Sequence, residues 1–495
     1  MKYDLNGLGQ RDASFTLRIG SAPHPDNMNR LSGPITTGSL QSALGQLVSI
    51  VGTEHAYFPE DEKFERYLSD ATYMRGQALL VLRPGSQNQL EAIITEVNAL
   101  RRAQPAEAAA LSLTLRGGGS GLSGAAVPAS GIVLDLTRLN RIIEIDERNQ
   151  TLRAECGVIL SDVNAALAGT GLWYPVDPSS LTLCTLGGSI ATNAAGPSSL
   201  KYGTTRQNLA ALKWLNASGE IIDAGSLPVK TSMGFSLTDL LCGSEGRLGL
   251  ILEATVRLAA EPADTALVLA GFADEHAAVE LILKMRRSGI APRSIELLDA
   301  FSLNLVDFPV AGAGALLMIE FDGDAEDVSS ALAKLQSLDK RCEWVAARDE
   351  KSRRQLWSKR KAITLELKKR YPYKLGEDIA VPLPALAATI AAARSDAAAQ
   401  GLETAIWGHA GDGNLHVNYL FESEAQLAKL EPLMFRLAQA ATRAGGAMSG
   451  EHGLGRLKRK IAQQVLSAEY FAVQRSIKNA LDPHCLFNPA LEQIS

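Results

Sequence analysis

The sequence has few cysteines, few histidines and no long apolar run. Its five cysteines are scattered, odd in number and never spaced as Cys-x-x-Cys, so we expect reduced thiols in a cytoplasmic setting rather than a disulfide framework. No apolar stretch approaches the ~18 residues that a membrane-spanning helix needs. The net charge of −5 comes without any basic block, which argues against nucleic-acid binding as the main task.

The composition that remains is that of a large globular protein. The chain has 495 residues, 46% of them apolar and 21% charged. Because single cores stop growing near ~250–300 residues, two or more domains are predicted. Residues 1–37 are polar, rich in Asn, Gly and Pro, and lack the apolar core of a signal peptide, so they are predicted to be a flexible N-terminal extension.

Three of the seven histidines lie in glycine-rich segments beside acidic residues. His409 and His416 flank a Gly-Asp-Gly-Asn turn between apolar runs, which predicts a β-hairpin that can bring both imidazoles to one point. Further on, Glu451 and His452 stand between glycines. Two His and one Glu are a familiar ligand set for zinc or another divalent first-row metal. The alternative is that each histidine is a hydrogen-bonded structural residue at the end of a strand.

A glycine-rich loop at residues 116–124 lies between two predicted strands, 111–115 and 132–136. Successive backbone N–H groups in such a loop form a concavity that binds anions, and glycine lets a phosphate come close. The loop contains the spacing G-x-G-x-x-G, but a Rossmann site needs a helix directly after it, and here Pro128 and Gly131 interrupt. The pattern favours a pyrophosphate cradle, and a mobile glycine linker is the alternative.

Two later segments are also rich in small residues. Residues 184–196 consist mostly of Gly, Ala, Ser and Thr with little regular pattern, and residues 243–249 hold another glycine cluster before a predicted strand at 250–258. Small side chains allow the backbone to pack closely against a partner. For residues 184–196 a flat ring system is one candidate for that partner, and a neighbouring helix is the other.

The pattern changes after Ala260 to alternating strands and helices. A Lys/Arg-rich run at 351–370 reads as a solvated helix face. The periodicity indicates an α+β domain with helices on one face of a mostly antiparallel sheet. Besides the histidine hairpin, strands are predicted at 266–272, 294–298 and 315–321, and helices at 275–287, 325–338, 383–399 and 424–444.

Taken in order, these segments resemble the FAD-linked D-2-hydroxy-acid dehydrogenases, flavoproteins of the vanillyl-alcohol-oxidase type. That group includes D-lactate dehydrogenase, the FAD subunit of glycolate oxidase and D-2-hydroxyglutarate dehydrogenase, and the similarity runs from about Tyr57 to Pro489. The resemblance implies an α+β fold in three stretches. These are a two-part FAD-binding domain at 38–259, a substrate-binding cap domain with an antiparallel sheet and the metal site at 260–452, and a C-terminal segment at 453–495 that returns to the FAD side.

The resemblance implies FAD as the cofactor. Some relatives attach the flavin through a histidine, and the glycine loop here has none, so non-covalent FAD is expected. The residues expected to bind it come from the glycine loop, the two small-residue segments and the C-terminal end. They are Arg116, Gly117, Gly118, Gly119, Ser120, Gly121, Leu122, Ser123, Gly124, Pro175, Asp177, Thr185, Gly187, Gly188, Ile190, Thr192, Asn193, Gly196, Glu245, Gly246, Gly249, Ile251 and Asn488.

The resemblance also assigns catalytic roles. It makes His409, His416 and Glu451 ligands of a divalent metal, with zinc as the first choice, and His452 the catalytic base. Substrate contacts are expected from Arg360, Thr364, Lys374 and Asn418. The implied reaction is oxidation of a D-2-hydroxy acid to the 2-oxo acid. Arg360 would pair with the carboxylate, the metal would assist loss of the hydroxyl proton to His452, and a hydride would pass to the flavin N5.

Two other function classes stay open at this stage. One is a metal-dependent hydrolase, which would use the two His and the Glu but would not explain the glycine segments. The other is a non-catalytic subunit that holds FAD within a larger oxidase and would need partner subunits. The substrate is also open. The Arg-x-x-x-Thr spacing of Arg360 and Thr364 favours D-2-hydroxyglutarate, and residues 374–382 favour D-lactate or glycolate. The electron acceptor (a quinone, a cytochrome or an electron-transfer flavoprotein), a homodimer and peripheral attachment to the inner membrane are likewise undetermined.

Overall fold

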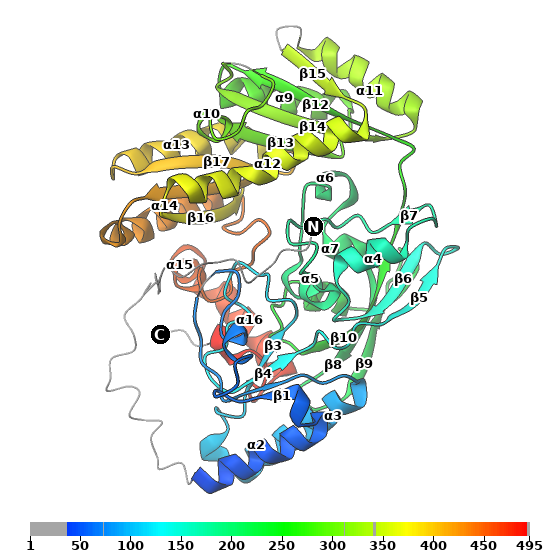
Figure 1. Cartoon of the computed structure of the whole chain (residues 1–495), viewed down its shortest axis with the longest axis vertical. Helices are drawn as coiled ribbons and strands as arrows, with labels where there is room; N and C mark the ends of the chain where they lie inside the picture. Colours follow the sequence, from blue (N-terminus) through cyan, green and yellow to red (C-terminus); the bar gives the residue numbers. More distant parts are fainter. Residues whose placement is uncertain (1–36, 73, 311, 340–342, 493–495) are drawn as a thin grey trace.

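The structure, a computed structural model, describes residues 37–72, 74–310, 312–339 and 343–492. Residues 1–36, where a flexible extension is predicted, lie outside this range. Figure 1 shows two bodies. We call residues 37–260 with 453–492 the two-sheet part, and residues 261–452 the seven-stranded part. Of the helices in the described ranges, none is long and apolar enough to cross a membrane.

The first sheet of the two-sheet part has four strands in the order β1-β2-β4-β3. Its last three strands are parallel, and β1 is antiparallel to β2. Leu80 and Leu82 face a core shared with two helices, while Val81 faces a smaller aromatic cluster on the other side. The elements are β1 (Ala56–Tyr57), β2 (Leu80–Leu82), β3 (Leu113–Arg116), β4 (Ile132–Asp135), α2 (Thr37–Val51) and α3 (Gln87–Ala103).

The glycine loop is the crossover between β3 and β4. These strands are parallel neighbours, and parallel strands need a connection of a dozen or more residues, usually a helix. Here residues 117–131, all of them described, make the connection without a helix. The prediction that this loop is not of Rossmann type is therefore confirmed.

The second sheet has five antiparallel strands in the order β5-β6-β10-β8-β9. A short helix, α5, packs on it within the small-residue segment, where the sequence shows little regular pattern. The strands are β5 (Ile142–Asp146), β6 (Thr151–Glu155), β8 (Leu209–Leu215), β9 (Ile221–Gly225) and β10 (Leu250–Arg257); β7 (Leu172–Trp173) pairs with β11 (Ala259–Ala260). The helices are α4 (Leu160–Ala166), α5 (Leu186–Thr192), α6 (Ser199–Tyr202), α7 (Thr205–Asn208) and α8 (Leu237–Leu241).

The third sheet is antiparallel throughout, in the order β15-β12-β14-β13-β17-β18-β16. Every strand and helix predicted after Ala260 is found, whereas β15 and β16 were not predicted. The strands are β12 (Asp264–Phe272), β13 (Ser294–Asp299), β14 (Ala315–Gly323), β15 (Glu343–Ala347), β16 (Tyr373–Ala380), β17 (Glu403–His409) and β18 (Asn414–Phe421). The helices are α9 (Glu275–Ser288), α10 (Ala300–Leu303), α11 (Ala325–Leu338), α12 (Glu350–Arg370), α13 (Leu386–Ala398) and α14 (Leu430–Arg443).

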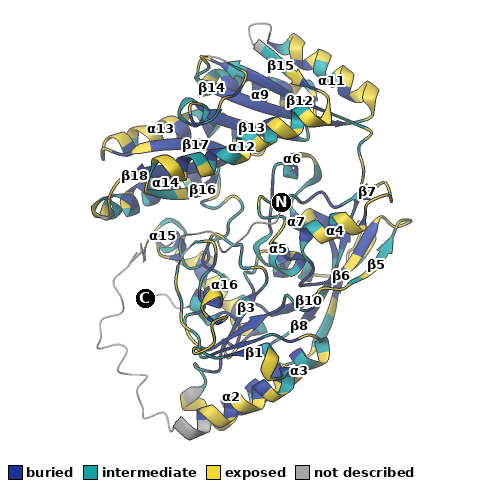
Figure 2. Ribbon diagram, in the orientation of Figure 1, coloured by how far each residue is buried: buried dark blue, intermediate teal, exposed yellow. Residues whose placement is uncertain are grey.

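The prediction that helices cover only one face of this sheet is wrong. Helices α9, α11, α13 and α14 pack on one face, and α12 packs on the other (Figures 1 and 2). The second face carries apolar residues such as Leu269 and Met318, which require a cover. Helix α12 supplies it with Leu356, Ile363 and Leu367, a narrow apolar stripe within an otherwise charged sequence.

The two parts meet at a polar contact around Arg293, which immediately precedes β13. Its Nε donates to Ser198 Oγ at 2.9 Å, and its guanidinium lies 4.6 Å from the centre of the Trp173 ring. Nearby, Lys201 donates to the buried Asp322 of β14 at 2.5 Å. At this contact the seven-stranded part is therefore held to β7 and to α6, whose N-cap is Ser198.

The chain returns to the two-sheet part through α15 (Arg459–Val465) and α16 (Ala468–Leu481). Residues 486–488 then lie along the free edge of β3, where Leu113 donates to Leu486 O at 2.8 Å and Asn488 donates to Leu113 O at 2.7 Å. A fully buried ion pair anchors this return, because Lys478 contacts Asp482 Oδ2 at 2.5 Å and Asp482 also accepts from the backbone of Leu486 and Phe487.

Substitution of Asp482 by Ala should therefore destabilise the protein. Removing one partner of a buried pair leaves the other charge uncompensated and typically costs about 3–5 kcal/mol. We expect a loss of that size in chemical denaturation. The control is Glu431→Ala, which removes one partner of the exposed Lys460–Glu431 pair and should cost less than about 1 kcal/mol. Equal effects of the two substitutions would contradict this account of the C-terminal return.

Candidate functional site

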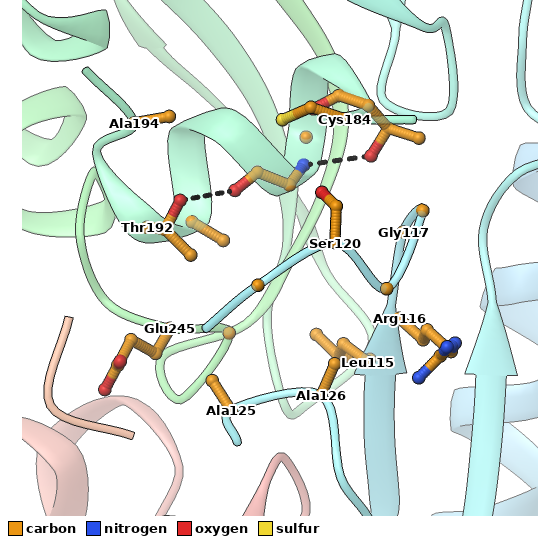
Figure 3. Close-up of a pocket in the computed structure, with 18 of the residues that line it drawn as sticks. Leu115, Arg116, Gly117, Ser120, Ala125, Ala126, Cys184, Thr192, Ala194 and Glu245 are labelled. Carbon is orange, nitrogen blue, oxygen red and sulfur yellow. Dashed lines mark hydrogen bonds between the residues drawn. The ribbon is translucent and has the colours of Figure 1, made fainter. Parts of the chain in front are cut away.

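A cavity lies above the ends of β3 and β10, between the glycine loop and α5 (Figure 3). Its wall is built from segments that are distant in the sequence, mainly within residues 115–126, 178–195, 241–251, 451–452 and 488. Of the residues predicted to bind the cofactor, those on the wall are Arg116, Gly117, Gly118, Gly119, Ser120, Gly121, Leu122, Ser123, Thr185, Gly187, Gly188, Thr192, Glu245, Gly246, Gly249, Ile251 and Asn488.

Two glycines of the loop are required by close approaches. A Cβ on Gly118 would lie 1.8 Å from the carbonyl oxygen of Leu183, and a Cβ on Gly117 would lie 2.3 Å from Thr185 Oγ1. Thr185 in turn caps α5, because its Oγ1 accepts from the backbone N–H of Gly188. The loop therefore fits against the segment that leads into α5 only without side chains at Gly117 and Gly118.

Six predicted residues do not line the cavity: Gly124, Pro175, Asp177, Ile190, Asn193 and Gly196. Two of them have side chains that hold the surrounding structure. Asp177 accepts from Ser198 Oγ at 2.7 Å, and Asn193 Oδ1 accepts from Thr204 Oγ1 at 2.9 Å. Other residues of the wall were not predicted, among them Leu115, Cys156, Cys184 and Leu241.

Two wall residues, Glu245 and Asn488, have left-handed backbone conformations, with φ of 54° and 44°. Such values are uncommon outside glycine and are held by surrounding contacts. Asn488 Oδ1 accepts from Leu115 N–H at 2.8 Å, and its Nδ2 donates to Glu245 O at 2.7 Å. Glu245 Oε1 accepts from Gly455 N–H at 2.8 Å. These bonds tie β3, the third glycine segment and the C-terminal residues together.

The candidate metal ligands His409, His416 and Glu451 come together at one point. Their nearest ligand atoms lie within 4.8 Å of one another. The Nε2 atom of His409 lies 3.8 Å from one Glu451 oxygen, and the Nε2 atom of His416 lies 3.6 Å from the other. The hairpin β17–β18 places the two imidazoles on the same face of the sheet, the face covered by α12. The geometry suits a divalent cation with two nitrogen ligands and one oxygen ligand.

Buried carboxylates hold the outer nitrogens of these histidines. His409 Nδ1 is hydrogen-bonded to Glu296, which also binds Arg360. Burial alone would raise the pKa of Glu296, but the neighbouring His409 and Arg360 lower it to about 2. For His409 the effects are reversed, because burial alone would lower its pKa and Glu296 raises it to about 10. Burial lowers the pKa of His416 to about 4. Without a cation, His416 is thus neutral at pH 7 whereas His409 carries a second proton, which a cation binding at its Nε2 would displace.

Asp378 of β16 organises the turn that carries Glu451 and His452. Its carboxylate accepts from the backbone N–H groups of Glu451 at 2.9 Å and His452 at 3.0 Å, and lies 3.9 Å from His452 Nδ1. Burial opposes ionisation of Asp378, yet His452, Lys458 and these N–H groups hold its pKa well below the usual range. Burial would lower the pKa of His452, but Asp378 and Glu451 raise it.

The candidate substrate residues lie on the same sheet face. Arg360 of α12 is paired with Glu296, Nη2 to Oε2 at 2.7 Å, and its guanidinium lies 5.6 Å from the centre of the Trp407 ring. Thr364 follows one helical turn later. Lys374 is half-buried and donates to Asn418 Oδ1 at 3.1 Å. Burial, with a contribution from Lys368, lowers the pKa of Lys374 to about 8.

The cavity and the histidine cluster are continuous, because Glu451 and His452 belong to the cavity wall. The residues that sequence reasoning missed are Glu296 and Asp378, the carboxylates behind the histidines. Their signal was present, since each is an acidic residue within a short apolar run, Ser-Ile-Glu-Leu-Leu and Glu-Asp-Ile-Ala-Val. A buried charge at such a position requires a partner.

Comparison with known proteins identifies the family. Residues 78–225 match the family described as FAD binding domain, and residues 261–491 match the family described as FAD linked oxidases, C-terminal domain. The chain is 31% identical to glycolate oxidase subunit GlcD of Bacillus subtilis, over 90% of this chain and 95% of the relative. It is 33% identical to D-2-hydroxyglutarate dehydrogenase of Xanthomonas citri, over 83% of this chain and 88% of the relative. It is 32% identical to D-lactate dehydrogenase of Archaeoglobus fulgidus, over 83% of this chain and 90% of the relative.

Solved structures show the same fold at low sequence identity. p-Cresol methylhydroxylase with substrate bound aligns with a TM-score of 0.75 at 13% identity, over 93% of this chain and 98% of that one. 4-Ethylphenol oxidase from Gulosibacter chungangensis aligns with a TM-score of 0.71 at 16% identity, over the same shares. The resemblance and the fold class predicted from the sequence are thus confirmed. The chain belongs to the FAD-linked oxidases, FAD-dependent enzymes with a fold of the vanillyl-alcohol-oxidase type.

Proposed function

We propose that the protein oxidises a D-2-hydroxy acid to the corresponding 2-oxo acid, using non-covalent FAD and a divalent metal, with zinc as the first choice. One observation carries the proposal. A single cavity has the glycine cradle on one side and Glu451 and His452 on another, and Glu451 is shared with the histidine cluster. A flavin and a metal-assisted hydroxyl group would therefore be neighbours. The relatives named as glycolate oxidase subunit, D-2-hydroxyglutarate dehydrogenase and D-lactate dehydrogenase support the substrate class.

The cavity suits FAD because glycines of three segments line it, which lets a pyrophosphate and a flat ring come close to the backbone. Glycine at residues 117–119 leaves this part of the loop without side chains. The loop also holds no histidine that could attach the flavin covalently. When bound, FAD supplies the acceptor for the hydride that leaves C2 of the substrate.

Replacement of Gly118 by Ala should abolish FAD retention. The new Cβ would meet the backbone oxygen of Leu183, which cannot move aside as a flexible side chain could, so the loop must shift. We expect the purified variant to be colourless, or to hold less than a tenth of the flavin of the parent protein. Gly45→Ala in α2, whose Cβ would meet nothing within 4 Å, should keep its full flavin content. A yellow Gly118→Ala protein would contradict the proposed cradle.

The histidine cluster suits a divalent metal through its ligand types and its outer contacts. His409 and His416 present Nε2 toward Glu451 while Nδ1 faces a carboxylate, the arrangement that fixes the tautomer of metal-binding histidines. A metal there would supply a Lewis acid for the 2-hydroxyl of the substrate.

The substrate carboxylate is assigned to Arg360, Lys374 and Thr364. The pairing with Glu296 uses Nε and Nη2 of Arg360, two of the three nitrogens of its fork. Lys374 lies beside Asn418, two residues beyond His416 on β18, so it can reach a carboxylate next to the metal site. Lys374 and Asn418 would then orient C2 of the substrate toward the cavity.

His452 would take the hydroxyl proton at Nε2. Its Nδ1 faces Asp378, and its Nε2 lies 3.4 Å from Glu451 Oε1, on the side of the cluster. Asp378 would hold the proton on Nδ1 and leave Nε2 free to accept, as the orienting carboxylate of a catalytic triad does. A cation on Glu451 would oppose the rise in the His452 pKa that Glu451 causes. The electrons then pass to an external acceptor, for which a quinone, a cytochrome or an electron-transfer flavoprotein is proposed.

The function is tested by the visible spectrum of the purified protein under anaerobic conditions. D-lactate, L-lactate, glycolate and D-2-hydroxyglutarate are added in turn. We expect one D-acid or glycolate to bleach the flavin bands, and L-lactate to leave them unchanged. The acid that bleaches fastest identifies the substrate. A flavin that none of these acids reduces would contradict the proposed activity, and it would favour a subunit that only holds FAD.

Substitution of His452 by Ala should slow flavin reduction by about 10²–10⁴, the contribution of a general base. Stopped-flow absorbance at saturating acid measures the step directly. His484→Ala, which changes a histidine outside the cavity wall, should leave the rate within a factor of two. A normal reduction rate in His452→Ala would remove His452 from the role of base.

A further inference from the structure

Glu296 is a carboxylate in the middle of an apolar strand. It is 1% exposed, and its neighbours on the same face of the sheet include Leu298 and Met318. Burying an ionised carboxylate costs several kcal/mol unless charged or hydrogen-bonded partners surround it. An apolar residue at this position would pack against α12 without that cost. The partners of Glu296 therefore indicate why a charge is placed here.

Each oxygen of Glu296 contacts a different residue of the site. Oε1 is hydrogen-bonded to Nδ1 of His409, and Oε2 accepts from Nε of Arg360 at 2.8 Å and from Nη2 at 2.7 Å. The strand register explains the first contact, because Glu296 and His409 are directly opposite each other in the pair β13–β17. Arg360 reaches the carboxylate from α12, above the sheet. One side chain thus joins a candidate metal ligand to a candidate carboxylate anchor.

We propose that Glu296 is a positioning residue that couples metal binding to recognition of the substrate carboxylate. The contact with Nδ1 keeps a proton on that nitrogen and turns Nε2 of His409 toward Glu451. The contact with Oε2 fixes the plane of the Arg360 fork relative to His409, the candidate ligand that shares the Glu296 carboxylate. The inference rests on the proposed function for the roles of His409 and Arg360.

A second buried carboxylate on the same sheet offers a matched control. Glu320 of β14 is 7% exposed, accepts from Trp357 Nε1 at 2.9 Å and lies 3.5 Å from Arg293 Nε. Its partners lie outside the metal cluster and the substrate residues. Glu296→Gln and Glu320→Gln therefore remove the same charge from similar surroundings, and only the first touches the site.

The experiment measures two affinities by calorimetry on flavin-loaded protein. Zn²⁺ is titrated, in competition with a chelator, into protein stripped of metal, and pyruvate and 2-oxoglutarate are titrated into Zn²⁺-loaded protein. We expect Glu296→Gln to weaken Zn²⁺ binding by about 10–100-fold, the usual cost of losing a partner of a metal-binding histidine. It should also weaken binding of the 2-oxo acid at least fivefold. Glu320→Gln should change both affinities less than threefold.

A double-mutant cycle separates the two contacts. In an Arg360→Met background, Glu296→Gln should no longer affect binding of the 2-oxo acid, because the group it orients is gone. Its effect on Zn²⁺ binding should persist, because His409 is still present. Glu296→Asp keeps the charge but is one methylene shorter, so it should recover part of the Zn²⁺ affinity, and it replaces the Gln variant if that protein does not fold.

The outcomes separate this inference from the proposed function. Equal losses in Glu296→Gln and Glu320→Gln would show a general effect of removing a buried charge and would overturn the inference. So would a Glu296→Gln protein that binds Zn²⁺ as tightly as the parent. A parent protein that binds no Zn²⁺ would overturn the proposed metal centre, and with it the metal half of the inference. Loss of 2-oxo acid binding in Glu296→Gln alone would support the Arg360 half in either case.

Discussion

The site depends most on the carboxylate of Asp378, which accepts hydrogen bonds from three consecutive backbone N–H groups. The donors are Gly450, Glu451 and His452, at 2.9–3.0 Å, and the Ser449 hydroxyl adds a fourth bond to the same oxygen. Such a run of N–H groups is a nest that binds one anionic oxygen. It fixes the turn from which Glu451 reaches the histidines. The second oxygen accepts from Asn414, at the start of the strand that carries His416, so a single side chain positions both ends of the cluster.

The same turn also joins the seven-stranded part to the glycine loop. Beyond His452 the chain reaches Gly455, whose N–H donates to Glu245, and Arg456, whose N–H donates to the carbonyl of Ser123. The turn that carries Glu451 is thus tied to the glycine loop by hydrogen bonds. The cavity is continuous with the histidine cluster because this short segment contributes Glu451 to both.

Sequence reasoning reached the parts of the molecule whose pattern is local. The glycine loop, the histidine hairpin and the strands β12, β13 and β14 of the third sheet are each visible within a dozen residues, because turn chemistry and periodicity act at that range. The packing of α12 on the second face of the third sheet was not predicted. Its buried residues Leu356, Ile363 and Leu367 form only a narrow apolar stripe in a helix that is charged elsewhere. Strand β16 was missed because it mixes Lys, Glu and Asp with its apolar residues.

What could not be predicted depends on register and on packing between distant segments. That Glu296 faces His409, and that Asp378 lies beside His416, follows only from the pairing of β13 with β17 and of β16 with β18. The six predicted cofactor residues that stand behind the wall rather than on it are a related case. Asn193 and Asp177 serve the cavity by holding neighbouring backbone, and a family motif does not distinguish that task from direct contact.

The position of Asn488 has a consequence for the order of events during synthesis. Its side chain bonds to Leu115 across a separation of 373 residues, and residues 486–488 complete the edge beside the glycine loop. A nascent chain can form β3 and the loop early, but the wall of the cavity stays open until this last segment has left the ribosome. Until residues 486–488 arrive, the edge of β3 is free to pair with other chains, so the growing protein passes through a form that is prone to aggregate, and pairing with these residues ends it.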